Sequence, residues 1–354
     1  MSIISPTLPD WPRAFGQPEA HGRIRSCPED FRVDEELGFE ADGEGEHLLV
    51  HLRKRNRNTD QVARQLARHA DVRARDVSYC GLKDRVAVTT QWFSIWLPGK
   101  PDPDWSSLED DDVQILTQAR HRRKLPRGAL RANHFTIVLR DIEGDHGALE
   151  QRLAALLEKG VPNYFGEQRF GRGGSNLLSA QNMFAGRRVK DRHLRGLYLS
   201  AARSFLFNEV LAARIADNSW NQVLLGEALM LTGSRSYFIA EKLDDEINRR
   251  HAEADVQSSG PLWGRGALPP QLDAQTLEIT VLAEQGVYRE GLEKAGLKQE
   301  RRVLSLSLAD LQWQWVDKHK SLQLTFSLPS GCYATSVLRE LLNTHSREPA
   351  SIKI

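Results

Sequence analysis

Cysteine is scarce in this chain of 354 residues. The three cysteines, Cys27, Cys80 and Cys332, lie far apart, and none forms a C-x-x-C pair or stands near paired histidines. This spacing argues against a structural zinc site and favours reduced thiols. We expect a cytoplasmic protein, because residues 1–12 show no targeting pattern and no apolar run has the length of a membrane span.

Long apolar runs are missing as well. No run approaches the ~18 residues of a membrane span, and residues 1–12 have neither a signal-peptide nor a transit-peptide pattern. The glycines at 171–174 lack both the G-x-G-x-x-G spacing and the lysine-serine pair of nucleotide-binding loops. His47, His51 and His69 lack metal-ligand spacing. The sequence thus predicts neither a membrane protein nor a metal or nucleotide cofactor.

Net charge is almost absent, at +1, which would seem to argue against a nucleic-acid partner. The charges are nevertheless unevenly distributed along the chain. Basic residues gather at 53–57, 64–75 and 120–127, and acidic residues gather at 34–36, 42–46 and 109–112. Such segregation would give a neutral protein the basic face expected of an RNA binder. The alternative is that each run is a solvated surface.

The length predicts two domains, and a content of 40% hydrophobic and 27% charged residues is typical of a globular protein with a core. Short apolar runs predict strands at 46–53, 112–119 and 134–140. Apolar residues at helical spacing predict a helix after residue 58, which Asn58 or Thr59 can cap, and another at 148–159.

The middle of the chain differs from both ends. After a glycine- and aromatic-rich connection, a helical pattern covers 199–216, a polar stretch with glycines and prolines follows, and strand signals are scarce. Alternating apolar residues then return in three runs, at 303–308, 311–315 and 322–328, which predict an antiparallel meander. We expect an α+β protein with a catalytic domain formed by 1–158 and 306–354 and a mainly helical inserted domain at 159–305.

The most informative stretch is Gly-Leu-Lys-Asp-Arg at 81–85, between strand-like runs at 77–80 and 86–97. Glycine permits a tight turn, and Lys83 and Arg85 would place the carboxylate of Asp84 between two positive charges. These five residues alone also fit a solvated hairpin turn.

Together with Ala-Val-Thr-Thr-Gln at 87–91, this stretch resembles the active-site segment of the TruD family of tRNA pseudouridine synthases, G-x-K-D-[KR] followed by A-V-T-x-Q. Further blocks resemble the same family in the same order: 28–31 leading to 43–47, then 128–135, 162–176 and 334–341. Five ordered blocks are much more specific than one short motif.

The resemblance implies a pseudouridine synthase-type catalytic domain, with a mainly antiparallel mixed sheet flanked by helices, and an inserted mainly helical α/β domain. It also implies an isomerase that converts a uridine of tRNA, uridine 13 in the D-arm, to pseudouridine, with Asp84 as the catalytic carboxylate acting on a flipped-out nucleotide. No cofactor is implied, and the family leans towards a monomer.

The resemblance also assigns residues around the target base. Phe31 and Tyr333 match aromatic positions around the uracil, and Phe135 matches a third, although a phenylalanine on an alternating strand also fits the core. Asn133 matches an asparagine that faces the substrate, and Arg25 a basic position expected to pair with Asp84. Two residues depart from the family pattern: Tyr333 stands where phenylalanine is more frequent, and Arg25 replaces a lysine.

The sequence leaves the chemical route open, because a carboxylate can attack the ribose as a nucleophile or abstract the C2′ proton to give a glycal. Either route requires that water be excluded from the glycosyl intermediate. Two other functions are also compatible with these residues. A glycoside hydrolase or nucleosidase would need a second carboxylate ~5–10 Å away, and an RNA chaperone would need only the basic residues and aromatics.

Overall fold

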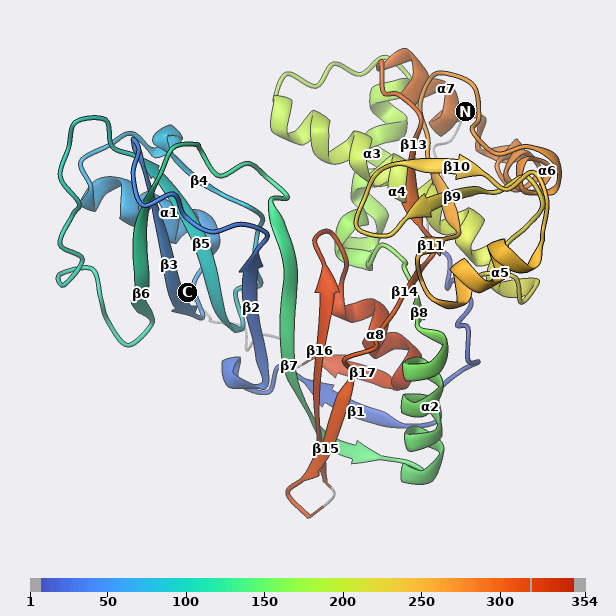
Figure 1. The fold of residues 1–354 in the computed structure, drawn as a ribbon, viewed down its shortest axis with the longest axis horizontal. Helices are drawn as coiled ribbons and strands as arrows, with labels where there is room; N and C mark the ends of the chain where they lie inside the picture. The colour runs from blue at the N-terminus through green and yellow to red at the C-terminus, as the bar shows by residue number, and fades with distance from the viewer. Residues whose placement is uncertain (1–7, 319, 347–354) are drawn as a thin grey trace. The chain divides into compact units, whose positions relative to one another are not determined.

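The structure is a computed structural model that describes residues 8–318 and 320–346 (Figure 1). The last part of the predicted catalytic domain, 306–354, therefore extends beyond the described residues at 347–354. Among the described residues, every helix is too short or too polar to cross a bilayer.

Contacts divide the chain into two compact units. Of the described residues, the sheet unit comprises 19–150, 308–318, 320–334 and 342–346, and the helical unit comprises 8–18, 151–307 and 335–341. The predicted insertion at 159–305 lies within the helical unit, which also takes in two segments that the prediction gave to the catalytic domain. Contact units are not the same as domains, and the domain limits stay a prediction.

A ten-stranded mixed sheet forms the sheet unit. Its main path runs in the order β15-β16-β7-β2-β5-β3-β6, with β1 and β17 joined beside β7 and β4 beside β5. The β2–β5 and β1–β17 pairs are parallel and the other pairs are antiparallel. The strands are β1 (His21–Ile24), β2 (Phe31–Leu37), β3 (His47–Arg55), β4 (Val77–Tyr79), β5 (Val88–Trp96), β6 (Val113–His121), β7 (Leu130–Glu143), β15 (Gln312–Val316), β16 (Ser321–Pro329) and β17 (Asn343–Ser346). The mainly antiparallel mixed sheet and the strands predicted at 46–53, 112–119 and 134–140 are confirmed.

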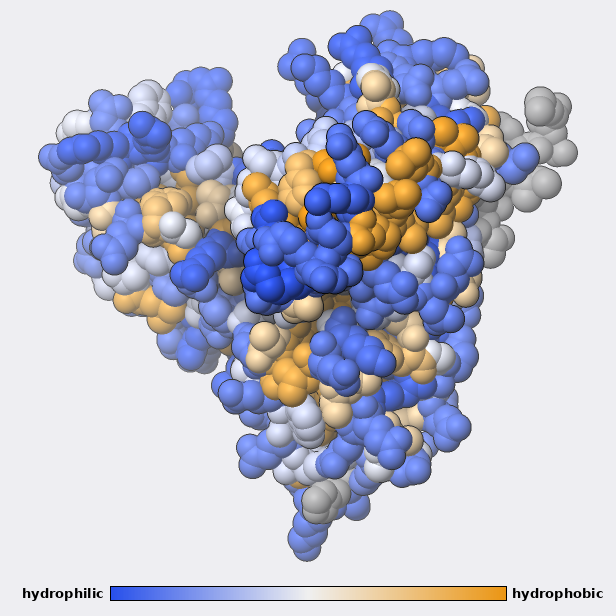
Figure 2. All heavy atoms as spheres, turned by 45° about the vertical axis from the view of Figure 1, so that its right-hand side comes forward, coloured by the Kyte–Doolittle hydropathy of each residue, from blue (hydrophilic) through white to orange (hydrophobic). Residues whose placement is uncertain are grey.

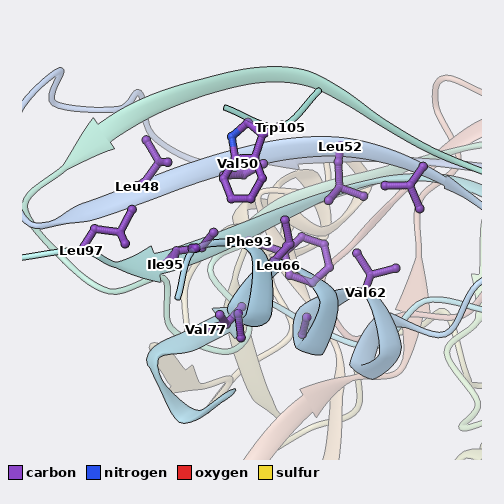
Figure 3. Close-up of a cluster of buried hydrophobic side chains, with 14 residues drawn as sticks. Leu48, Val50, Leu52, Val62, Leu66, Val77, Phe93, Ile95, Leu97 and Trp105 are labelled. Carbon is purple, nitrogen blue, oxygen red and sulfur yellow. The ribbon is translucent and has the colours of Figure 1, made fainter. Parts of the chain in front are cut away.

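Helix α1 (Thr59–His69) covers one face of β3 and β5, and the core between them is shown in Figure 3. Leu48, Val50 and Leu52 are fully buried, because every second residue of a strand points to the same face. They pack with Val62 and Leu66 of the helix, which lie one turn apart.

The predicted cap residue is confirmed in its position but not in its hydrogen bond. Asn58 is the N-cap residue, but its side chain makes no capping hydrogen bond. Thr59 is the first residue of the helix, and its buried hydroxyl donates a hydrogen bond to the side chain of Gln91 instead.

The helical unit contains α3 to α7 and most of α2 and α8. These helices are α2 (His146–Lys159), α3 (Ser175–Phe184), α4 (Arg192–Ala216), α5 (Asp245–Ala252), α6 (Leu272–Val281), α7 (Gly286–Lys294) and α8 (Ala334–Leu341). The α4 helix begins seven residues before the predicted start at 199, because the side chain of Asp191 accepts hydrogen bonds from the backbone N–H groups of His193 and Leu194. Short 3₁₀ turns cover Pro28–Asp30, Ala74–Asp76, Glu167–Phe170, Arg172–Gly174 and Ala283–Gln285 across the two units.

Strands in the middle of the chain are short, which explains why the sequence showed few signals for them. They are β8 (Val161–Pro162), β9 (Ala228–Leu231), β10 (Tyr237–Ile239), β11 (Val256–Gln257), β12 (Ser259–Leu262), β13 (Glu300–Val303) and β14 (Ser305–Leu306).

The helical unit also leaves apolar side chains exposed on α6 and α7, among them Leu272, Ile279 and Val287. Figure 2 shows apolar areas within a mainly hydrophilic surface.

The predicted three-stranded meander is wrong in its first strand. The run at 303–308 is divided between β13, which pairs with β12, and β14, which pairs with β8. Only β15 and β16 pair with each other, and β16 then pairs with β7. Alternation predicted correctly that Leu304, Leu306 and Leu308 are buried, but it carries no information about the partner strand.

Candidate active site

Asp84 lies in the connection between β4 and β5, and buried polar side chains form hydrogen bonds with the backbone of this loop. The side-chain amide of Gln91 donates to the carbonyl of Gly81 at 2.6 Å. Its oxygen accepts from the hydroxyl of Thr59 at 3.0 Å, and the same hydroxyl oxygen accepts from the backbone N–H of Lys83 at 3.1 Å. Thr59 and Gln91 are both buried, so the loop is fixed by contacts that water does not weaken.

A buried lysine makes a further contact with the loop. The ammonium group of Lys54, on β3, donates to the backbone carbonyl of Asp84 at 3.1 Å and to that of Arg57 at 2.8 Å. Its side chain is fully buried. Burial lowers the pKa of Lys54 to about 8, although the charge of Asp84 acts in the opposite direction.

Lys83 and Arg85 do not flank the carboxylate as predicted. The ammonium group of Lys83 pairs with the buried carboxylate of Glu35 on β2, and Arg85 is exposed. Burial raises the pKa of Glu35, and the charge of Lys83 opposes this shift. Adjacency in sequence therefore did not decide the ionic partner of Asp84.

The cation on Asp84 is Arg25, as the resemblance implied. A guanidinium nitrogen of Arg25 donates to a carboxylate oxygen of Asp84 at 2.8 Å. Arg25 has a φ of 56°, which costs a residue other than glycine about 1–2 kcal/mol. The side chain of Asp84 is 37% exposed. The water-poor surroundings expected for Asp84 are therefore not formed in this structure.

Phe31 and Phe135 lie next to this ion pair. The guanidinium of Arg25 lies 4.3 Å from the centre of the Phe31 ring, and the Phe31 and Phe135 rings meet edge to face at 6.2 Å. Phe135 also stacks on Phe326 at 5.3 Å. Phe31 is 2% and Phe135 7% exposed, so both rings are part of the core here and Arg25 covers Phe31.

Asn133 and Tyr333 are the remaining predicted residues. Asn133 is buried on β7, opposite Glu35 on β2 and Leu328 on β16, and its side-chain oxygen has no hydrogen-bond partner. Tyr333 is half-buried in the connection between β16 and α8. This connection leaves the sheet next to Asn133, because β16 ends at Pro329, the residue after Leu328.

The predicted segregation of charges in sequence does not persist in space. The acidic run at 42–46 contacts the basic cluster at 120–127, where Asp42 pairs with His121 and Glu44 pairs with Arg122. The acidic run at 109–112 likewise supplies two carboxylates to Arg57. Much of the basic face predicted from these clusters is thus neutralised within the sheet unit.

Other cations are exposed and have no carboxylate partner among the described residues. In the sheet unit these include Arg123, Lys124 and Arg127. In the helical unit, the connection from α3 to α4 and the first turn of α4 carry Arg187, Arg188, Lys190, Arg192 and Arg195, all exposed. Sequence reasoning missed this second group, although five basic residues among the nine at 187–195 are a clear signal.

The side chains that support the loop were also missed. Lys54 could have been found, because it continues the buried face of β3 after Leu48, Val50 and Leu52. Gln91 is the last residue of the quoted motif, but spacing alone did not give it a role. The contacts of Glu35 and Thr59 join residues far apart in sequence, and no local pattern indicates them.

A pocket with a volume of about 340 Å³ lies in the sheet unit apart from the candidate site. Its lining contains none of the predicted site residues and mixes acids with arginines: Glu29, Arg32, Asp34, Arg53, Arg55, Val88, Thr90 and Asp111. Within the described part of the chain, no three His, Cys, Asp or Glu side chains are grouped so that they could hold a metal ion.

The fold is shared with a solved protein. A crystal structure of the putative tRNA pseudouridine synthase D (TruD) from Methanosarcina mazei matches with a TM-score of 0.70 at 24% identity, and the match covers 95% of this chain and 96% of that one. The architecture is therefore the α+β fold of that protein class.

Sequence comparisons define the family. The model of the tRNA pseudouridine synthase D (TruD) family matches residues 13–186 and 175–341. Curated proteins named tRNA pseudouridine synthase D are similar to this chain: one from Methylococcus capsulatus is 53% identical over 338 residues, 95% of each chain, and one from Aeromonas hydrophila is 50% identical over 333 residues, 94% of each chain. The chain belongs to the tRNA pseudouridine synthase D family, and it is thus an enzyme of the isomerase class.

Proposed function

We propose that this enzyme converts uridine 13 in the D-arm of tRNA to pseudouridine, and that Asp84 is its catalytic carboxylate. The observation that carries the proposal is the ion pair between Asp84 and Arg25 on a loop anchored by buried contacts. Such anchoring holds one carboxylate in a fixed place while leaving its oxygens accessible to a substrate.

The reaction rearranges one nucleoside without any external reactant. The bond from ribose C1′ to uracil N1 breaks, the base turns, and C1′ bonds to C5, which then loses its proton while N1 gains one. Asp84 acts either as the nucleophile at C1′ or as the base that removes the C2′ proton. Arg25 holds the carboxylate in place through a charge-assisted hydrogen bond.

The flipped base would lie beside Asp84, Asn133, Phe31 and Tyr333. The side-chain oxygen of Asn133 lacks a partner in the free chain, and an amide can bond the polar edge of uracil. For a base to stack on Phe31, Arg25 must move from the ring that it covers. Binding of the RNA would also have to remove water from Asp84, which is open to solvent without it. Phe135 would support Phe31 from within the core.

The RNA backbone would contact the exposed arginines and lysines described above, since phosphates bind cationic side chains. Cys27, Cys80 and Cys332 are not joined in disulfides, which suits the reducing cytoplasm, where tRNA is modified.

The test uses tRNA labelled with tritium at C5 of its uridines. We expect tritium release without abasic sites from a tRNA with uridine 13, and none when cytidine occupies that position. Asp84→Asn should abolish release and keep RNA affinity, because phosphate contacts dominate binding. Asp71→Asn is the matched control, since Asp71 is fully exposed and its ion pair is with the exposed Lys100. Abasic sites would indicate hydrolysis instead, and turnover by Asp84→Asn would refute the role of Asp84.

A further inference from the structure

We infer that Lys54 is a positioning residue for the reaction, whose ammonium group fixes the backbone of Asp84 and thereby the place of its carboxylate. The inference rests on the proposed role of Asp84. It concerns a residue that does not touch the substrate and that belongs to none of the motifs quoted above.

The first argument is the cost of the residue. The Lys54 side chain is fully buried on a strand face that is otherwise apolar, and no carboxylate within the described part of the chain lies within ion-pair distance of it. A buried charge without an ionic partner costs several kcal/mol, and an apolar residue of similar length would avoid this cost. A buried ammonium group without an ionic partner therefore indicates that Lys54 has a specific function.

The second argument is the pair of atoms that the ammonium binds. It donates to the carbonyl of Asp84 and to the carbonyl of Arg57, which precedes α1 by two residues. The loop that carries the carboxylate is thereby tied to the segment that leads from β3 into the helix. Carbonyl oxygens bound by a charged donor are held about twice as strongly as by a neutral one.

The third argument is that the other contacts do not replace this one. Gln91 holds Gly81 and Thr59 holds the N–H of Lys83, so both act before residue 84 in the loop. Arg25 binds the carboxylate of Asp84, and no hydrogen bond within the described part of the chain joins it to the backbone of that residue. Lys54 alone among these contacts holds the backbone of Asp84.

The charged groups that face Lys54 are Asp84 and Lys83 of the loop and Glu35 of β2. Burial lowers the pKa of Lys54 to about 8, Asp84 and Glu35 raise it, and Lys83 lowers it. As the pH rises through this value, the ammonium becomes a neutral amine and its hold on the Asp84 carbonyl weakens. The rate of the chemical step should therefore fall above about pH 8.

The main test replaces Lys54 with methionine, which is similar in length and has no charge. Tritium release in a single turnover with saturating tRNA should fall on the order of 10²-fold at pH 7, the effect of a displaced catalytic group. The Kd for tRNA should stay within about twofold, because Lys54 is buried and does not contact phosphates. The wild-type rate should decline above pH 8, and Lys54→Met should lack this decline. Lys100→Met, at an exposed lysine of the same unit, is the control.

A second measurement decides the matter if Lys54→Met does not fold. The Lys54 ammonium signal in nitrogen-15-labelled enzyme should titrate with the same midpoint as the rate, and Asp84→Asn should lower this midpoint because a nearby negative charge is lost. A full rate in Lys54→Met, or a rate that does not follow the titration, would overturn the inference alone. Turnover by Asp84→Asn would instead overturn the proposed function together with it.

Discussion

Gln91 is the residue whose loss should most directly release the loop that carries Asp84. Gln91→Leu keeps the volume of the side chain but removes two hydrogen bonds, one to the carbonyl of Gly81 and one from the hydroxyl of Thr59. A buried hydrogen bond contributes about 1 kcal/mol, and an orphaned buried polar group costs about 1–3 kcal/mol more. We expect Gln91→Leu to lower the free energy of unfolding by about 2–4 kcal/mol.

The assay is urea denaturation followed by tryptophan fluorescence, with tritium release measured on the same preparations. Thr59→Val removes the shared hydrogen bond from its other side. In the double variant, the losses of free energy should fall short of the sum of the single losses by on the order of 1 kcal/mol, because the two residues share one bond. Gln61→Leu, on the exposed face of α1, should change stability by less than about 0.5 kcal/mol.

Two results would refute this account of the loop. One is a loss below about 1 kcal/mol for Gln91→Leu, which would mean that the Gly81 carbonyl finds another partner. The other is full additivity of Gln91→Leu and Thr59→Val, which would show that the bond between them does not contribute to stability.

Three further predictions concern RNA binding, pH and a buried ion pair. Reversing both charges, Arg187→Glu with Arg188→Glu, should weaken tRNA binding and reduce the slope of log affinity against log salt by about 1.5, as expected for two lost phosphate contacts. His51 stacks on Trp92 and burial lowers its pKa, so the folded state resists protonation; stability should fall as the pH drops below 6.5, and His51→Gln should lessen this fall measured by urea denaturation. Arg140→Met should cost about 2–3 kcal/mol of unfolding free energy, discounted for the partial exposure of Arg140, because it leaves the buried carboxylate of Asp30 without its bidentate partner.

Each of these has its own control or contrary outcome. Arg235→Glu, another exposed arginine of the helical unit, should leave the salt slope unchanged if the group at 187–195 is the contact surface. An unaltered acid response in His51→Gln would assign that response to other groups. Arg131→Met removes an exposed pair with Glu36 and should cost less than about 1 kcal/mol, so an equal loss at Arg131 and Arg140 would show that burial of Asp30 does not matter.

The interpretation of the sequence was most successful where the signal is local. The alternation of apolar residues correctly predicted three strands of the sheet and the buried leucines of the later runs. It failed where the partner of a segment had to be known: the run at 303–308 joins strands other than β15, and the acidic runs meet the basic clusters that they were expected to avoid. Charges far apart in sequence attract each other when the fold brings them together, and a pattern of residue types does not give the spatial distance between them.

The sequence by itself determined the family, the position of Asp84 between two strands, and the ion pair that Arg25 forms with it from 59 residues away. These conclusions follow from several short motifs that occur in the same order as in the family, which is much more specific than one motif alone. Only the tertiary structure decided that Lys83 turns from Asp84 to Glu35, and that Gln91, Thr59 and Lys54 hold the loop. The physical reason is that buried polar groups must find partners, and the partner is set by how the strands and the helix pack together.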